Sequence, residues 1–289
     1  MAGTAIMVDR GLPAPAKLNL HLHIVGRRED GMHLIDSVMV LIDLADTIYV
    51  TLRQDGKLCR TWNHLDVSDD LCLRAATALQ KLANVSLGAD IAVEKRIPIG
   101  AGLGGASSDA ATTLLALNAL WQAGFTRQQL AALAAQLGAD IPFFLFGETA
   151  RAQGIGECLT AIEAPLHYYL LAFPGKAATA AVFEEYQQIT DKQHLSNISE
   201  ALQHDCNHLA VAAVRVCPPI IAAAQQLQAA AGEARLSGSG ACVFAAFDTV
   251  AAAKAAQQKL PSQLPSVVSA GIIRHPLLES HLHWGVAKW

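Results

Sequence analysis

A glycine-rich segment at residues 98–111, PIGAGLGGASSDAA, has the composition best suited to chemistry in this chain. Glycines let backbone N–H groups approach phosphate oxygens, and a helix N-terminus adds positive potential. The segment opens into an Ala- and Leu-rich stretch, and Ser107, Ser108 and Asp109 stand where a helix start prefers small polar or acidic residues. It therefore predicts a phosphate-binding loop followed by a helix. A tight strand-to-helix turn without a ligand has the same composition.

Two nucleotide-binding motifs do not fit this segment. Gly100, Gly102 and Gly105 have the spacing G-x-G-x-x-G of dinucleotide-binding folds. That motif requires a following strand that ends in an acidic residue about 20 residues later. Residues 121–136 contain no acidic residue and predict a second helix instead. A Walker A loop is excluded because Ala106 stands at the position of its lysine.

Two further candidates lie outside this loop. Residues 17–24 alternate between apolar and polar side chains and predict a half-buried strand, with Lys17 and Asn19 together on its polar face. Asp140 lies in a Gly-x-Asp-x-Pro context before an apolar, strand-like stretch. Taken alone, Lys17 and Asn19 are best interpreted as a solvated strand edge and Asp140 as an ordinary loop aspartate, so neither candidate is decisive by itself.

Histidines occur in two closely spaced pairs. His21 and His23 share the polar face of the predicted strand, and His281 and His283 lie near the C-terminus. A structural zinc site needs four ligands, and no third ligand accompanies either pair in the sequence. We therefore predict no zinc site at either pair.

The remaining pattern predicts the elements that position these candidates. Residues 37–50, 91–94 and 168–173 read as strands, and residues 71–83 read as a helix. Thr126 and Gln129 have capping-box spacing before a second helix after the glycine-rich loop. A second small-residue loop, SGSG at residues 237–240, precedes an apolar strand. Because strands and helices segregate, we predict an α+β chain with two lobes, residues 1–160 and 161–289.

The composition excludes several classes of protein. The 289 residues are 52% hydrophobic and 16% charged, with a net charge of −4 and no basic stripe, so nucleic acid is not an expected partner. Apolar runs are too short to cross a membrane, and the start lacks the features of a signal peptide. Six cysteines without a Cys-x-x-Cys pair are typical of reduced thiols in the cytoplasm. No coiled-coil pattern is present, and we expect a monomer or a weak homodimer.

Taken together, these segments resemble the GHMP kinase superfamily. The segment at 98–111 is similar to its phosphate loop, and the segments PAKLNL at 15–20, GADIP at 138–142 and SGSGAC at 237–242 follow in the same order. With the element Asp30-Gly31-x-His33 they resemble those members that phosphorylate 4-diphosphocytidyl-2-C-methyl-D-erythritol. The resemblance extends from residue 15 to about residue 247.

This resemblance implies a fold and a reaction. The N-terminal lobe would contain a left-handed βαβ element, the C-terminal lobe would be ferredoxin-like, and the site would lie between them. ATP would phosphorylate the 2-hydroxyl of the methylerythritol unit, giving the 2-phosphate and ADP in the non-mevalonate pathway of isoprenoid biosynthesis. Mg²⁺ is implied together with ATP.

The resemblance also assigns roles to residues of this chain. Asp140 matches the catalytic base, and Lys17 matches the lysine that orients it and offsets developing charge. Ser107 or Ser108 could ligate the metal ion, and no carboxylate ligand is assigned. The ATP side comprises Lys95, Pro98, Gly100, Gly102, Leu103, Gly104, Gly105, Ser107 and Ser108. The substrate side comprises Asn19, Met32, His33, Thr179 and Phe183.

The sequence departs from the family pattern at two places. Met32 stands where the family usually has an aromatic residue that stacks on cytosine, and a thioether packs against a ring less rigidly than an aromatic side chain does. Asp69 and Asp70 precede the helix at residues 71–83, where an asparagine near the adenine pocket is common.

Three other functions remain to be weighed against this one. A homoserine or mevalonate kinase would share the loop but not the segments at 15–20 and 30–33. A non-catalytic nucleotide-binding paralogue would not need both Lys17 and Asp140. A nicotinamide-dependent dehydrogenase is disfavoured by the two successive helices predicted after the loop.

Overall fold

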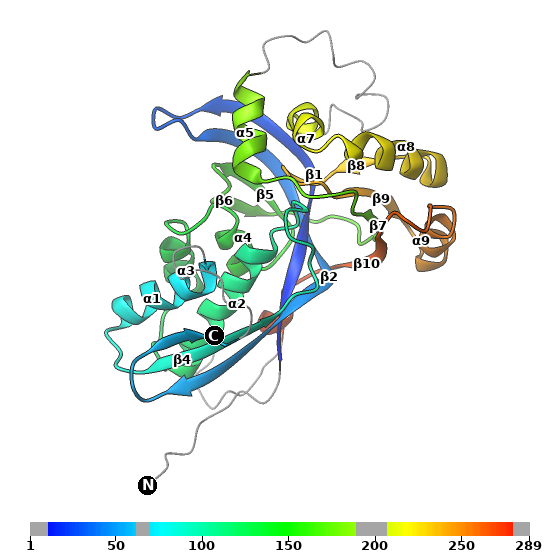
Figure 1. Cartoon of the computed structure of the whole chain (residues 1–289). Helices are drawn as coiled ribbons and strands as arrows, with labels where there is room; N and C mark the ends of the chain where they lie inside the picture. The colour runs from blue at the N-terminus through cyan, green and yellow to red at the C-terminus, as the bar shows by residue number, and fades with distance from the viewer. Residues whose placement is uncertain (1–10, 62–69, 189–206, 280–289) are drawn as a thin grey trace.

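The chain forms an α+β fold with two lobes, as the sequence predicts, and one sheet extends through both lobes (Figure 1). A computed structural model describes residues 11–61, 70–188 and 207–279. The N-terminal elements are β1 (Leu12–Arg27), β2 (His33–Arg53), β3 (Leu58–Arg60), α1 (Leu71–Ala83), β4 (Gly88–Glu94), α2 (Gly105–Leu120), α3 (Arg127–Ala134), α4 (Ile141–Phe146), β5 (Ala150–Gly154) and β6 (Cys158–Ala161). The C-terminal elements are β7 (Tyr168–Ala172), α5 (Thr179–Gln188), α7 (Ala210–Val216), α8 (Pro219–Ala231), β8 (Arg235–Leu236), β9 (Val243–Phe247), α9 (Val250–Gln257), β10 (Ser266–Ile272) and α10 (Pro276–Glu279).

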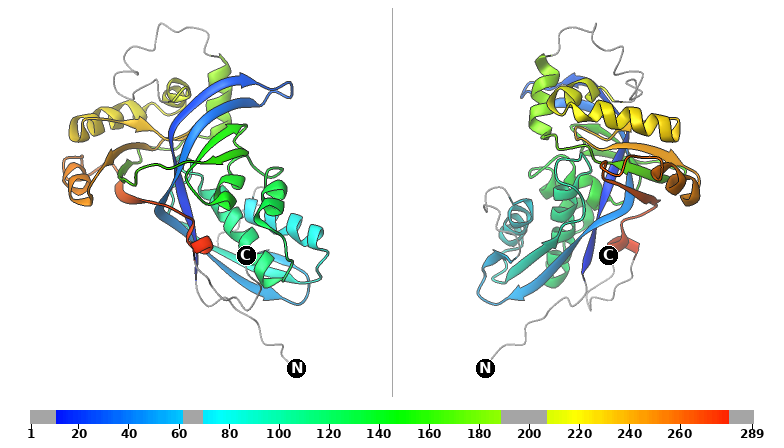
Figure 2. Two further views of the ribbon diagram at one scale, coloured as in Figure 1. Left: turned by 180° about the vertical axis from the view of Figure 1, so that it is seen from behind. Right: turned by 45° about the vertical axis from the view of Figure 1, so that its right-hand side comes forward.

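The strand pair β1–β2 runs through the whole molecule and ends in a projecting hairpin (Figure 2). The two strands are antiparallel, from Leu12 opposite Ile48 to Arg27 opposite His33. β2 also pairs with β4, β5 and β10 along different parts of its 21 residues. This length exceeds the predicted strand, because each part of β2 finds a different partner.

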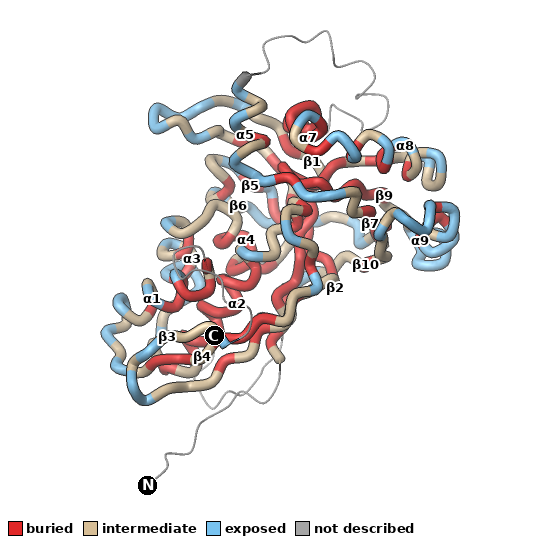
Figure 3. Tube along the Cα trace, in the orientation of Figure 1, coloured by how far each residue is buried: buried red, intermediate tan, exposed pale blue. Residues whose placement is uncertain are grey.

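The prediction that β1 is half-buried is wrong around its first polar residues. Lys17 is 4% exposed and Asn19 is 1% exposed, so both faces of β1 are covered there. Buried strands of this kind are shown in red through the middle of the molecule (Figure 3). The alternation in the sequence reflects two different environments, one apolar and one polar, rather than core and solvent.

The helices of the N-terminal lobe start with the expected signals. Asp70 caps α1, accepting from the backbone N–H groups of Cys72 at 2.8 Å and Leu73 at 3.1 Å. The predicted capping box of Thr126 and Gln129 is present at the start of α3. The α2 helix is buried almost all round, which accounts for its Ala- and Leu-rich composition.

The stretch after Asp140 is a helix, α4, and its strand-like interpretation is wrong. Asp140 is the N-cap residue and Pro142 lies in the first turn, where a missing N–H costs nothing. A run of six apolar residues has no periodicity that separates a buried strand from a buried helix. The proline signal before Phe143 identifies the helix start.

The C-terminal lobe has the strand order of a ferredoxin-like fold. Its strands lie in the order β10-β7-β9-β8, all antiparallel, with helices between β7 and β8 and between β9 and β10. α7, α8 and α9 gather beside this part of the sheet (Figure 1).

The two lobes are joined by more than the chain connection. Gly271 and Ile272 at the end of β10 pair with Ile42 and Leu41 of β2, so one 10-stranded sheet extends across both lobes. The following residues return to the N-terminal lobe, where the backbone N–H of His275 donates to the carbonyl of Gly147 at 2.7 Å. Among the described residues, no helix is long and apolar enough to cross a membrane.

Candidate active site

The glycine-rich loop lies where the two lobes meet. Gly100, Gly102 and Gly104 have φ values of +76°, +77° and +69°, a region that L-residues with side chains rarely adopt. A Cβ atom on Gly102 would lie 2.6 Å from the backbone nitrogen of Gly240. Glycine is therefore required here both by the backbone conformation and by the close approach of the loop at residues 237–240.

Main-chain hydrogen bonds hold the loop on both sides. The N–H of Lys17 on β1 donates to the carbonyl of Leu103 at 3.0 Å. From the C-terminal lobe, Ala177 donates to Gly100 and Cys242 donates to Ala101, each at 3.0 Å. These hydrogen bonds attach the loop to both lobes.

The start of α2 can accept an anion. Gly104 is the N-cap residue and supplies no side-chain hydrogen bond, and α2 is 16 residues long. Its first N–H groups and its dipole therefore point at the loop without a capping side chain. The hydroxyl of Ser108 donates to the carbonyl of Pro15 at 2.6 Å, whereas the hydroxyl of Ser107 has no hydrogen-bond partner among the described residues. The N–H groups at the start of α2 fit a phosphate. Because Ser108 is already hydrogen-bonded, Ser107 is the hydroxyl that could bind a metal ion next to that phosphate.

Lys17 lies buried beside this loop with its ammonium on Asn19. The Nζ atom of Lys17 donates to Oδ1 of Asn19, and Nδ2 of Asn19 donates to the hydroxyl of Ser37 at 2.8 Å. Ser37 donates in turn to the carbonyl of His21 at 2.5 Å. Burial lowers the pKa of Lys17, and the nearby charge of Asp140 opposes that shift.

Asp140 faces this lysine from the start of α4. Its side chain makes no capping hydrogen bond and is partly exposed, so the carboxylate remains available to a ligand. A Cβ atom on Gly104 would lie 3.2 Å from Cγ of Lys17 and 2.8 Å from the ring of Phe144 on α4. The loop, β1 and α4 therefore meet at one point and bring Lys17 near Asp140.

The loop at residues 237–240 covers the same point. A Cβ atom on Gly238 would lie 2.9 Å from Oδ1 of Asn19 and 3.1 Å from Nζ of Lys17. Ser237 accepts from the N–H of Asn19 and donates to the carbonyl of Gly102, both at 3.3 Å. Ser239 hydrogen-bonds Thr179 at 3.0 Å, which brings the predicted substrate residue Thr179 to this loop.

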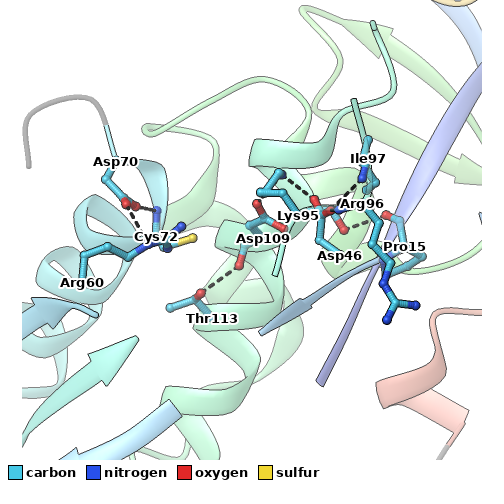
Figure 4. A network of polar contacts seen from close by, with 11 residues as sticks. Pro15, Asp46, Arg60, Asp70, Cys72, Lys95, Arg96, Ile97, Asp109 and Thr113 are labelled. Atoms are coloured by element: carbon cyan, nitrogen blue, oxygen red, sulfur yellow. Dashed lines mark hydrogen bonds and ion pairs between the residues drawn. The ribbon is translucent and has the colours of Figure 1, made fainter. Parts of the chain in front are cut away.

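Two aspartates hold the side chain of Lys95 beside the start of α2, where the glycine-rich loop ends (Figure 4). Its ammonium pairs with Asp46 on β2 and, at 2.8 Å, with Asp109 on α2. Burial disfavours the charged lysine, but the two carboxylates outweigh it and leave the pKa of Lys95 raised. Asp109 was expected only as a helix-start residue, and Asp46 belongs to no motif in the sequence.

The substrate-side residues His33 and Phe183 form an aromatic group. Their rings stack with centroids 5.2 Å apart, and Tyr186 on α5 meets His33 edge-on at 5.7 Å. Met32 is next to His33 on the hairpin and is 44% exposed. Tyr186 was missed by sequence reasoning, although its position one helical turn after Phe183 was a usable signal.

Two sequence interpretations concern residues outside this region. Among the described residues, no group of three or more His, Cys, Asp or Glu side chains could hold a metal ion. His21 and His23 therefore belong to no such group. His281, His283 and Asp69 lie outside the described residues.

Comparisons with known proteins agree with this architecture. The model of the GHMP kinase N-terminal domain matches residues 70–148, and the model of the GHMP kinase C-terminal domain matches residues 184–266. A 4-diphosphocytidyl-2-C-methyl-D-erythritol kinase of Thiobacillus denitrificans is 47% identical over 94% of this chain and 99% of that protein. One of Herminiimonas arsenicoxydans is 46% identical over 92% of this chain and 96% of its own length.

Solved structures show the same relationship. A 4-(cytidine 5'-diphospho)-2C-methyl-D-erythritol kinase superimposes with a TM-score of 0.74 at 34% identity, covering 91% of this chain and 99% of that one. A mevalonate kinase shares the fold with a TM-score of 0.66 at 16% identity, covering 92% of this chain and all of that one. The chain therefore belongs to the GHMP kinases and, within them, to the family of the 4-diphosphocytidyl-2-C-methyl-D-erythritol kinases.

Proposed function

We propose that this kinase transfers the γ-phosphoryl group of ATP to the 2-hydroxyl of 4-diphosphocytidyl-2-C-methyl-D-erythritol, giving the 2-phosphate and ADP. The observation that carries this proposal is the meeting of Lys17, Asp140 and the glycine-rich loop at one point between the lobes. The names of relatives at 44–47% identity support the choice of substrate. The reaction is a step of the non-mevalonate route to isoprenoid precursors.

Asp140 acts as the base for the attacking hydroxyl. Its carboxylate is not used as a helix cap, so it can accept the hydroxyl proton as the phosphoryl group is transferred. Lys17 orients this carboxylate and offsets the negative charge that spreads over the transferred group. Phosphoryl transfer depends mainly on such positioning and electrostatic stabilisation.

ATP binds with its phosphates at the glycine-rich loop, from Gly100 to Ser108, with Pro98 and Leu103 shaping the loop and Lys95 beneath it. Ser107 is a ligand for Mg²⁺, because Ser108 already donates to Pro15. When bound, Mg²⁺ neutralises charge on the phosphates. The free N–H groups at the start of α2 support this assignment.

The alcohol substrate binds beside the β1–β2 hairpin and α5, where the rings of His33 and Phe183 stack. Phe183 and His33 hold the cytosine ring, Met32 packs against it, and Asn19 and Thr179 contact the remainder of the substrate. We place the boundary between the lobes just after β6, one residue beyond the expected division at 160/161, and expect the enzyme to work as a monomer or a weak homodimer. The cysteines in the described residues are free thiols, which supports a cytoplasmic enzyme.

The test is a parallel assay of four alcohols. Purified protein is mixed with Mg-ATP, and ADP release is followed with 4-diphosphocytidyl-2-C-methyl-D-erythritol, 2-C-methyl-D-erythritol 4-phosphate, mevalonate and homoserine. Turnover with the cytidyl substrate alone supports the proposal. Turnover with another alcohol keeps the kinase but replaces the substrate, and ATP binding without any turnover contradicts catalysis.

A further inference from the structure

Asp46 ties three consecutive residues to the middle of β2. Its Oδ1 atom accepts the backbone N–H groups of Arg96 at 2.5 Å and Ile97 at 2.8 Å, and its Oδ2 atom pairs with the ammonium of Lys95. The side chain of Asp46 is fully buried. These three residues lead from β4 into the glycine-rich loop, so one carboxylate fixes the approach to that loop (Figure 4).

The ammonium of Lys95 is aimed at the start of α2. A Cβ atom on Gly105, the first residue of α2, would lie 3.3 Å from Nζ of Lys95. Asp109, one turn further along α2, holds the same ammonium from the other side at 2.8 Å. The two carboxylates therefore hold the Lys95 ammonium beside the N-terminus of α2, where the glycine-rich loop ends.

The second carboxylate on the Lys95 ammonium, that of Asp109, is also buried. Burial raises the pKa of Asp109 to about 7, and Asp46 adds to this rise while Lys95 opposes it. Oδ1 of Asp109 has no hydrogen-bond partner among the described residues. From α1, the thiol of Cys72 also faces Asp109, but burial raises its pKa to about 12, so it stays neutral.

We infer that Asp46 is a positioning residue of the nucleotide site, which fixes the Lys95 ammonium against the first turn of α2 and thereby sets the affinity for ATP. The inference rests on the proposed function, because the loop and Lys95 are assigned to ATP there. Asp46 does not touch the reacting atoms; it acts through Lys95 and the backbone at residues 96 and 97.

The substitution Asp46→Asn separates this role from a purely structural one. The amide oxygen still accepts from the N–H groups of Arg96 and Ile97, but the negative charge that holds Lys95 is lost. Asp109→Asn is a second variant, because the Asp109 carboxylate accepts from the Lys95 ammonium and holds no segment of backbone in place. Asp90→Asn is the matched control. Asp90 lies on β4 away from the loop, and its carboxylate pairs with Arg53 at a distance of 2.9 Å.

The experiment is calorimetric titration of each full-length variant with Mg-ATP, without any alcohol. Asp46→Asn and Lys95→Met should each weaken binding about tenfold, the loss typical of a charge-assisted hydrogen bond. The double variant Asp46→Asn/Lys95→Met should bind Mg-ATP no more weakly than the weaker-binding of the two single variants, because both substitutions remove the same interaction. Asp109→Asn should also bind more weakly, and Asp90→Asn should match the wild type.

Rescue by a conservative variant gives an independent readout. Asp46→Glu keeps the negative charge beside the Lys95 ammonium and should recover part of the Mg-ATP affinity that Asp46→Asn loses, which a role confined to packing would not produce. Wild-type affinity in both Asp46→Asn and Asp109→Asn, or additive losses in the double variant, would overturn the inference. ATP binding by the wild type without phosphorylation of the cytidyl alcohol would refute the proposed substrate. The ATP affinities of the variants would then still decide the role of Asp46. A wild type that binds no Mg-ATP would refute both.

Discussion

Gly238 of the C-terminal lobe lies directly against Lys17 of the N-terminal lobe, so close that a Cβ atom on Gly238 would come 3.1 Å from the lysine Nζ and 2.9 Å from Oδ1 of Asn19. Gly238 also has a φ of +59°. The carbonyl of Gly238 accepts from Nδ2 of the buried Asn207 at 2.8 Å, which holds the loop in this place. The loop at residues 237–240 thus covers the ammonium of Lys17 rather than forming an ordinary turn.

Gly238→Ala should therefore lower kcat/KM by about tenfold or more, because the methyl group displaces the Lys17 ammonium. Gly124→Ala is a matched control: Gly124 has a φ of +74°, and a Cβ atom added there would meet nothing within 4 Å. Both variants incur the same kind of backbone strain, about 1–2 kcal/mol. Steady-state kinetics and thermal melting separate the two effects, and equal losses of activity in both variants would show that the contact with Lys17 is unimportant.

Asp140→Asn should abolish most turnover while leaving ATP binding intact. An amide cannot accept the hydroxyl proton, and loss of a general base lowers kcat by about a hundredfold to ten-thousandfold. Single-turnover rates and Mg-ATP affinity are measured for this variant and for Asp248→Asn, whose side chain is 93% exposed. A parallel loss of ATP binding in Asp140→Asn would instead assign the residue a structural role.

Met32→Tyr should tighten the cytidyl substrate. A tyrosine beside His33 would add an aromatic face to the group formed with Phe183 and Tyr186. Aromatic stacking of about 0.5–1.5 kcal/mol corresponds to a KM lower by about twofold to tenfold. The KM for ATP should not change. Leu82→Tyr on α1, at a side chain 51% exposed, is the control for a surface tyrosine. An unchanged or higher KM for the alcohol would mean that Met32 does not face the cytosine.

His275 makes stability depend on pH in the acid range. It is fully buried, its Nδ1 atom accepts from the N–H of Leu277 at 3.2 Å, and burial lowers its pKa to about 3. A folded-state pKa below the unfolded value of about 6.5 means that its stabilising contribution is full above pH 6.5 and is lost as the pH falls toward 3.

His275→Gln should therefore flatten the acid limb of the stability curve. One proton taken up on unfolding corresponds to a slope of about 1.4 kcal/mol per pH unit. Urea titrations at pH 7, 6, 5 and 4 measure the slope for wild type, His275→Gln and the control His167→Gln. The side chain of His167 is 30% exposed, in contrast to the buried His275. Equal slopes for all three proteins would contradict the assignment to His275.

Local signals in the sequence were sufficient for the elements whose cause is local. The capping box of Thr126 and Gln129 and the helix at residues 71–83 were predicted because a cap and a hydrophobic period act within one segment. The glycine-rich loop before α2 was predicted for the same reason: the positive φ angles and the helix start are properties of consecutive residues. The stretch after Asp140 was misread because six apolar residues carry no distinguishing period.

Only the tertiary structure decided which polar residues are buried and what holds them. The N–H of Asn19 meets Ser237 across 218 residues, and Lys95 meets Asp46 across 49, so no local window contains either pair. A buried charge or amide is stable only where distant segments supply its hydrogen bonds, and that supply is a property of the folded chain. The sequence by itself determined the glycine-rich loop and the kinase family. Folding determined that Gly238 and Asn19 lie against Lys17 and that Asp46 pairs with Lys95.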